Sequence, residues 1–118
     1  NVVVDVGHHD AYARERGILA DSARRLNGLP VLFVGVHCPI EIIMERRQNT
    51  GWNVGSTADS PIPHPVQLWQ HEVHIPGIYD LEVDTSLLTP GACAEVIRQH
   101  LADSPSPSAF QRLAAHYT

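Results

Sequence analysis

Residues 31–36 read VLFVGV, an uninterrupted apolar run that follows Pro30. Such runs are typical of strands that are buried on both faces, as in parallel sheets. Two further segments have strand character: residues 1–6 (NVVVDV), with three consecutive valines, and residues 81–84 (LEVD). The sequence therefore predicts three short strands.

Helical patterns lie between and after these strands, because apolar residues there recur at helical spacing. Thr89-Pro90 is a typical helix start, with an N-cap followed by a first-turn proline. Strands that alternate with helices pair in parallel through right-handed crossovers, so we expect an α/β layered fold. The predicted helices cover residues 10–26 (one helix, or two short ones), 39–48, 65–73 and 90–101.

The chain divides into a body and a tail. Its 118 residues are enough for one domain. Residues 49–65 contain two glycines and three prolines, which predicts a long surface loop, either a lid or a disordered segment. Residues 104–108 alternate serine and proline as a linker does, and we expect residues 109–118 to form at best a weak, peripheral helix. The predicted domain thus covers residues 1–102, followed by a linker and weakly ordered tail over residues 103–118.

The composition excludes several classes of function. All eight cationic side chains are arginines, so no lysine is present for a Schiff base or a GxxxxGK[ST] phosphate loop. A net charge of −5 argues against a nucleic-acid partner, because phosphate neutralisation needs a positive face. No apolar run approaches the roughly 20 residues of a membrane span. The two cysteines lack CxxC spacing and are too few for a disulfide scaffold, so we expect a cytoplasmic protein. From the charge and the short apolar runs we expect no nucleic-acid or membrane partner.

Polar residues follow each predicted strand, where ligands bind in open parallel sheets: Asp5–Asp10, His37-Cys38 and Asp84-Thr85. An aspartate that ends an apolar strand, such as Asp5, is the Walker B pattern, in which the carboxylate holds Mg²⁺ directly or through water. The alternative is a strand-end cap. Arg46-Arg47 ends a predicted helix, where the guanidinium groups either stabilise a transferring phosphoryl group or balance the helix dipole.

Histidines suggest a different kind of site. His8, His9 and Asp10 follow the first predicted strand, and His71 and His74 come later in the chain. Such a set would suit a metal-dependent hydrolase, in which a divalent ion activates water. The histidines of the segment 71–74 are separated by only two residues, so the segment is not an HExxH motif. A metal site therefore stands as an alternative.

Several segments together resemble the chloramphenicol phosphotransferase-like family of small P-loop kinases. They are VLFVGVHC (31–38), the stretch 39–46 and above all VHIPGIYDLEVDT (73–85), while VVVDVGHHD (2–10) resembles the family's Walker B strand and the loop after it. The resemblance covers about residues 2–101 in the same order. It implies a parallel three-layer P-loop NTPase fold of the nucleoside-monophosphate-kinase type, truncated at the N-terminus. It also implies transfer of the ATP γ-phosphoryl group to a hydroxyl of a small-molecule acceptor.

The resemblance assigns roles to individual residues, with ATP and Mg²⁺ as cofactors. Asp5 would be catalytic and would lie near Mg²⁺, holding it through water. Arg46 would be the lid arginine, catalytic and in contact with the nucleotide. The residues that would face the acceptor are Gly7, His8, His9 and Asp10, and those that would lie beside the adenine are Asp84, Thr85, Ser86 and Leu87.

The chain also departs from the family pattern. Family members carry further arginines in an Arg-Gly-Asp-Arg-like lid run, where this chain has NTGWN (49–53). The family's phosphate loop, its lysine and its catalytic aspartate would lie upstream of Asn1. We therefore expect a fragment of a longer kinase that is inactive and at best weakly folded by itself. A non-catalytic nucleotide-binding module is the other alternative.

Overall fold

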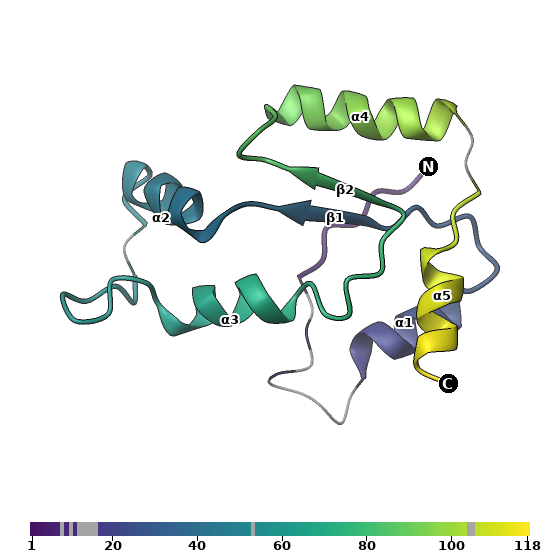
Figure 1. Cartoon of the computed structure of the whole chain (residues 1–118), viewed down its shortest axis with the longest axis horizontal. Helices are drawn as coiled ribbons and strands as arrows, with labels where there is room; N and C mark the ends of the chain where they lie inside the picture. The colour runs from purple at the N-terminus through teal and green to yellow at the C-terminus, as the bar shows by residue number, and fades with distance from the viewer. Residues whose placement is uncertain (8, 10, 12–16, 53, 104–105) are drawn as a thin grey trace.

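The computed structural model describes residues 1–7, 9, 11, 17–52, 54–103 and 106–118, which form a mixed α/β arrangement (Figure 1). The helices predicted over residues 39–48, 65–73 and 90–101 are present, with bounds shifted by one residue. The first predicted helix is described only from Ile18. None of the described helices is both long and apolar enough to span a membrane. In chain order the elements are α1 (Ile18–Leu26), β1 (Val34–His37), α2 (Ile40–Asn49), α3 (His64–Glu72), β2 (Leu81–Asp84), α4 (Pro90–Ala102) and α5 (Ala109–His116).

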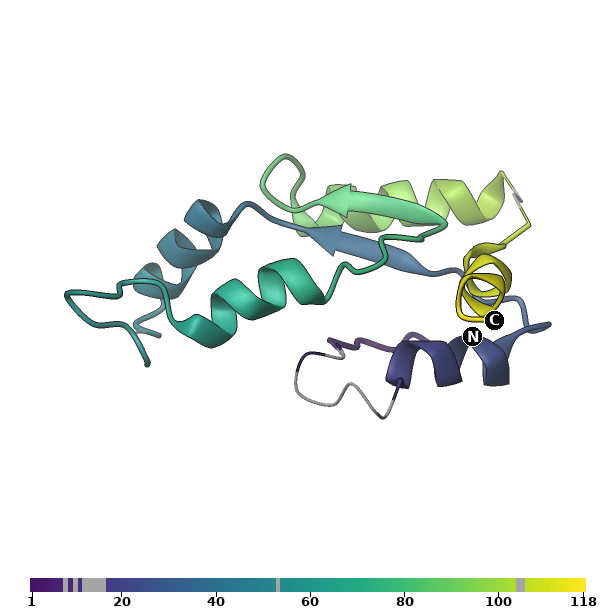
Figure 2. The ribbon, with the colours of Figure 1, turned by 60° about the horizontal axis from the view of Figure 1, so that its bottom comes forward.

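β1 and β2 form a two-stranded parallel sheet within the described part of the chain. The register runs from the pair Val34 and Leu81 to the pair His37 and Asp84. β2 has the predicted bounds, and β1 begins three residues later than predicted. Both strands run from the side of α5 toward the side of α2, and α4 packs on β2 (Figure 1, Figure 2). The predicted parallel pairing is therefore confirmed for these two strands.

Residues 1–6 do not form the predicted strand. Their valine side chains are exposed, Val3 to 96% and Val2 to 87%. No backbone hydrogen bond joins them to another described residue, and a strand persists only where its N–H and C=O groups pair with a neighbour. The prediction was wrong here because an apolar run does not itself supply a pairing partner. Asp5, as a consequence, is not held at the end of a strand.

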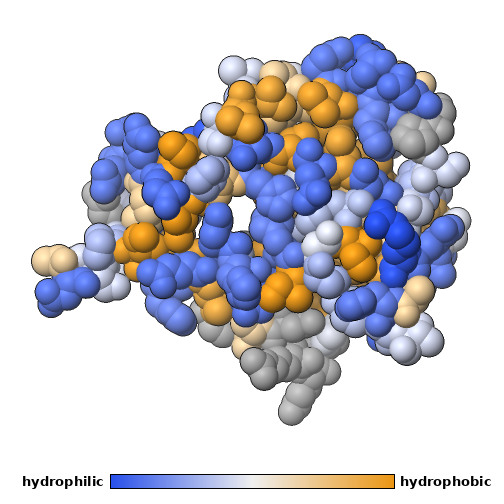
Figure 3. Space-filling model, viewed as in Figure 1, coloured by the Kyte–Doolittle hydropathy of each residue, from blue (hydrophilic) through white to orange (hydrophobic). Residues whose placement is uncertain are grey.

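The arrangement leaves much apolar surface exposed. The radius of gyration is 16.1 Å, whereas a compact chain of this length has about 13.5 Å. The accessible surface is 8294 Å², against roughly 6,300 Å² for a compact monomer of this mass. Val36 of β1 is 55% exposed and Leu87 is 80% exposed. Figure 3 shows such apolar surface, in orange, at several places on one face. A sheet of two strands is too small to cover these side chains.

The best-buried side chains lie between α1 and α5, which are side by side in both ribbon views (Figure 1, Figure 2). Leu113 and Ala109 of α5 are fully buried, as is Ala23 of α1. On the same helix, Phe110 contacts Phe33 with ring centroids 5.0 Å apart. The expectation of a peripheral helix at residues 109–118 was therefore wrong. Its apolar residues face a partner helix that is far away in the sequence.

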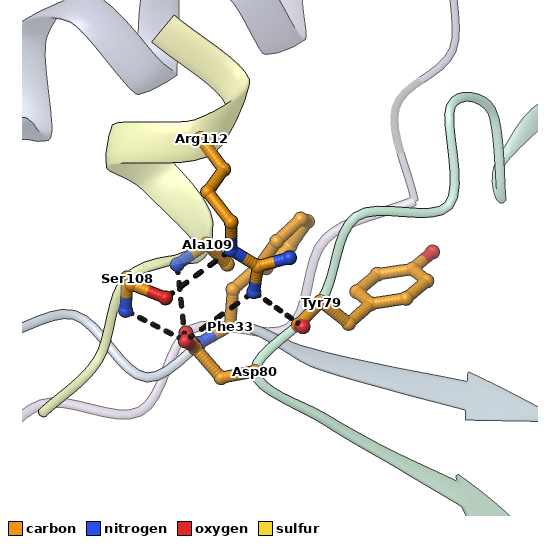
Figure 4. Close-up of polar contacts among 6 residues, drawn as sticks. All are labelled: Phe33, Tyr79, Asp80, Ser108, Ala109 and Arg112. Carbon is orange, nitrogen blue, oxygen red and sulfur yellow. Dashed lines mark hydrogen bonds and ion pairs between the residues drawn. The ribbon is translucent and has the colours of Figure 1, made fainter. Parts of the chain in front are cut away.

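The carboxylate of Asp80 fixes α5 to the start of the sheet (Figure 4). Its side chain is only 6% exposed. It accepts hydrogen bonds from the backbone N–H groups of Phe33 at 2.9 Å, Ser108 at 2.7 Å and Ala109 at 3.0 Å. Arg112 of α5 donates to the carbonyl of Tyr79 at 2.9 Å. Asp80 thus joins the beginnings of both strands to the N-terminus of α5, where a negative charge also suits the helix dipole.

We predict that Asp80→Ala lowers the free energy of unfolding by about 2 to 4 kcal/mol, because three part-buried N–H groups lose a charged acceptor. Urea unfolding followed by circular dichroism measures the change. Asp21→Ala, which removes the exposed ion pairs of Asp21 with Arg24 and Arg25 on α1, is the matched control and is expected to cost less than about 1 kcal/mol. Equal losses in the two variants would contradict the role given to Asp80.

Candidate functional site

The loop after β2 is a tight turn held by Asp84. The Asp84 carboxylate accepts from the backbone N–H of Ser86 at 2.8 Å and from its hydroxyl at 2.5 Å. These two donors hold the pKa of Asp84 below its ordinary value. The N–H of Thr85 donates to the carbonyl of His37 at 2.9 Å, which ties the loop to the end of β1. The turn leaves the side chain of Leu87 exposed.

Arg46 reaches this loop from α2, the helix that follows β1. Its guanidinium group donates to the hydroxyl of Thr85 at 2.9 Å and to the Thr85 carbonyl at 2.6 Å. The structure thus brings Arg46 together with the predicted adenine-side residues 84–87, at the carboxyl ends of both strands. Asp84 and Thr85 were predicted from their place at a strand end and Arg46 from its place at a helix end, whereas Ser86 and Leu87 follow from the family resemblance. The functional roles of these residues stay predictions.

Arg47, the next residue, holds the predicted lid instead. Its guanidinium lies 4.4 Å from the ring centre of Trp52 and donates to the Val54 carbonyl at 3.2 Å. The N–H of Trp52 donates back to the Arg47 carbonyl at 2.8 Å. The sequence pattern indicated the arginine pair at the end of a helix but gave no contact between Arg47 and the loop. A basic residue followed five positions later by tryptophan is a weak signal, since the contact depends on how the chain leaves α2.

The predicted acceptor-side residues lie against α3. A Cβ atom at Gly7 would overlap the ring of Trp69, so a larger residue there would require that ring to move. The ring of His9 meets Trp69 edge-on, with centroids 5.5 Å apart. His8 and Asp10 lie outside the described residues. Asp5 is exposed and has no hydrogen bond or ion pair with another described residue, so the structure does not unite it with Arg46 or the 84–87 loop.

Four polar side chains form a cluster across β1, β2 and the segment that joins α3 to β2: His37, His74, Tyr79 and Glu82. The His37 and His74 rings stack with centroids 4.0 Å apart, and Nδ1 of His74 is hydrogen-bonded to the Tyr79 hydroxyl at 2.6 Å. Glu82 is 2.9 Å from Nε2 of His37. Burial and the neighbouring His37 lower the pKa of His74, and burial and Glu82 raise the pKa of Tyr79.

This cluster bears on the metal alternative. His74 is engaged with Tyr79 and His37, and no group of three His, Cys, Asp or Glu side chains within the described ranges converges as metal ligands do. His8 and Asp10, which the hydrolase reading requires, are outside those ranges. The metal-dependent hydrolase therefore gains no support from the described residues.

We predict that the chain loses stability as the pH falls through the range below 6.5, the ordinary pKa of histidine. The folded chain binds a proton at His74 only at a lower pH than the unfolded chain does, so protons favour unfolding in this range. Urea midpoints measured from pH 7.5 to pH 5 should decrease, and His74→Gln should flatten the decrease. His71→Gln, an exposed site on α3, is the control, and an unaltered slope in His74→Gln would contradict the prediction.

Residues 1–102 match the sequence model of the family described as chloramphenicol phosphotransferase-like protein. No curated protein and no solved structure matches the chain in the corresponding comparisons. Members of the matched family are kinases that use ATP and have a P-loop fold. Because the match covers most of the chain, the protein belongs to the chloramphenicol phosphotransferase-like family.

Proposed function

We propose that this chain provides the nucleoside-side and lid portion of an ATP-dependent phosphotransferase that acts on a hydroxyl group of a small molecule. One observation carries the proposal. Arg46 and the loop 84–87 meet at the carboxyl ends of two parallel strands, which is where ligands bind in sheets of this kind. Family membership supplies the class of reaction.

The residues at this place suit one part of ATP. Leu87 offers exposed apolar surface against which a base could lie, and the turn at Asp84 holds that surface in position. Arg46 remains charged at every physiological pH and could balance negative charge on a phosphoryl group. The residues present cannot form a phosphate-binding loop of the P-loop type, because none of the 118 residues is a lysine and the sequence has no glycine-rich phosphate loop. We therefore propose that this polypeptide does not transfer phosphate by itself.

The exposed apolar surface supports the same proposal. Val36 on β1 and the valines of residues 2–4 are in contact with solvent. In the proposed enzyme a phosphate-loop strand lies between residues 1–6 and β1, covers these side chains and pairs with both segments. Residues 1–6 would then become a strand and would carry Asp5 to a water-mediated contact with Mg²⁺. Gly7 and His9, already packed on Trp69, would face the acceptor together with His8 and Asp10.

We predict that ATP added to the isotope-labelled chain shifts the backbone amide resonances of residues 84–88 and of Arg46. Arg46→Met should weaken this binding by about ten- to hundredfold, because hydrogen bonds to a charged group contribute about 1.5 to 3 kcal/mol. Arg25→Met, which removes an exposed arginine of α1, is the matched control and should bind ATP like the unaltered chain. Shifts confined to other parts of the chain would contradict the proposed site.

We also predict no ATP hydrolysis or transfer above background for the 118-residue chain, measured by release of ADP with a panel of hydroxyl acceptors. Turnover by this chain would overturn the proposed inactivity. The protein encoded by the complete reading frame is expected to carry a glycine-rich loop with a lysine and to release ADP. Absence of such a loop would overturn the kinase proposal. Nucleotide binding without transfer would instead favour a non-catalytic module, which the arginine-poor lid sequence NTGWN (49–53) makes the second candidate.

A further inference from the structure

α3 is not held in place by a buried apolar face. None of its residues is buried, and it does not pack closely against another described helix or strand, whereas α1 packs on α5 and α4 packs on β2. Burial of an apolar face is what orients most helices in folded proteins. Contacts of individual side chains must therefore determine where α3 lies.

Two such contacts join the C-terminal part of α3, and the turn after it, to the end of β1. The side-chain amide of Gln70 donates to the backbone carbonyl of Cys38 at 2.7 Å, in a part-buried contact. Four residues later, the ring of His74 stacks on the ring of His37, with centroids 4.0 Å apart. Since Cys38 directly follows His37, the two contacts hold consecutive residues at the carboxyl end of β1.

The carbonyl of Cys38 depends on the donor that Gln70 supplies. Cys38 lies one residue past the last residue pair of the sheet, and no backbone N–H of a described residue donates to its carbonyl. A part-buried carbonyl without a partner is unfavourable. Gln70 therefore satisfies a backbone group that the sheet leaves unpaired.

Trp69, the residue before Gln70, contacts the predicted acceptor-side residues. A Cβ atom at Gly7 would overlap its ring, and the ring of His9 meets it edge-on at 5.5 Å. Trp69 is 46% exposed, so part of its surface remains accessible to a ligand. Consecutive residues of a helix project about 100° apart, so the orientation of α3 that brings Gln70 to Cys38 also determines where the ring of Trp69 lies.

We propose that Gln70 is a positioning residue for the acceptor side of the proposed site. Its hydrogen bond to Cys38 holds α3 at the end of β1, and this keeps the ring of Trp69 beside Gly7 and His9. The proposal rests on the proposed function only where it assigns the acceptor to residues 7–10. The position of Trp69 relative to Gly7 is a property of the chain alone.

The two Hα protons of Gly7 report the position of Trp69 without any ligand. One of them points toward the indole ring, because it occupies the direction in which a Cβ atom would overlap that ring. The ring current should therefore separate the two Hα resonances. Gln70→Leu should remove most of this separation. Gln67→Leu, the same substitution at an exposed position of α3, is the matched control and should leave the separation unchanged.

A second variant and a measurement on the unaltered chain cover the case in which Gln70→Leu does not fold. Gln70→Glu keeps the size of the side chain, but at neutral pH its carboxylate cannot donate to a carbonyl, so the Gly7 separation should again be lost. Methyl resonances of Leu113, which is fully buried between α1 and α5, should stay in place in a folded variant. In the unaltered chain, the Nε2 protons of Gln70 should exchange with water about twofold to tenfold more slowly than those of Gln67.

Each of three results would overturn the proposal. The first is an unchanged Gly7 separation in a folded variant of Gln70. The second is an equal loss of that separation in Gln67→Leu. The third is equal exchange of the Nε2 protons of Gln70 and Gln67 in the unaltered chain.

Phosphoryl transfer distinguishes this proposal from the proposed function. In the protein encoded by the complete reading frame, Gln70→Glu should raise the KM of the hydroxyl acceptor that gives turnover by about twofold to tenfold, and the KM of ATP should not change. A rise in the KM of ATP alone would overturn the assignment of Gln70 to the acceptor side. If no acceptor of the panel gives turnover, the proposed function fails, while the Gly7 resonances still decide whether Gln70 positions Trp69.

Discussion

The buried carboxylate of Asp80 is the constraint on which the rest of the structure depends. A buried charge is tolerated only when hydrogen bonds replace its water, and here the backbone N–H groups of Phe33, Ser108 and Ala109 do so. Phe33 also packs between Tyr79 and Phe110, with centroid distances of 5.0 Å to each ring. The starts of β1 and β2 are thereby held in one register. That register places Asp84 beside His37 and so determines where the candidate site forms.

The two ends of the sheet differ in their physical character. At the amino ends, the side chain of Asp80 is largely enclosed and hydrogen-bonded, and the buried apolar residues of α1 and α5 lie nearby. At the carboxyl ends, the contacts of Arg46 with Thr85 and of Arg47 with Trp52 are exposed to water. Buried networks tend to be rigid, whereas exposed contacts rearrange readily. The molecule therefore combines a fixed anchor with an adjustable set of loops, which is an arrangement suited to ligand binding.

Membership in a family of ATP-dependent kinases agrees with this arrangement, but the family match does not cover the whole chain. The matched residues end at residue 102, whereas α5 begins at Ala109. The helix that completes the buried core thus lies outside the matched region, although the Asp80 carboxylate that binds it lies inside. The absence of lysine, the exposed valines and the arginine-poor lid all concern the phosphate side of the proposed site. The proposed nucleoside side, where Arg46 meets residues 84–87, is the part for which the chain supplies its own residues.

Local signals in the sequence determined β2, α4 and the approximate extent of α2 and α3. The N-cap at Thr89, for example, involves only its own hydroxyl and the N–H of Ala92, at 3.1 Å. The rule that ligands bind at the carboxyl ends of parallel strands indicated Asp84 and Thr85 as candidates, whereas Arg46, Ser86 and Leu87 were given nucleotide roles by the family resemblance. The sequence could not show which distant segments come into contact, because the contacting residues are far apart along the chain. Asp80 and Ala109 are 29 residues apart, and Arg46 and Thr85 are 39 apart, so only the folded chain decides that they meet.

The valines of residues 2–4 and the helix α5 both show that the sequence of a segment does not determine whether the segment is buried. The valines have strand-forming side chains but no partner among the described residues, and they remain in solvent. Leu113 belongs to a short helix with a weak sequence signal, yet it is fully buried because α1 lies against it. The sequence alone determined which segments can be helical or extended, through propensity and capping. Tertiary structure decided which of them are buried, because burial and strand pairing require a second surface that no segment carries in its own residues.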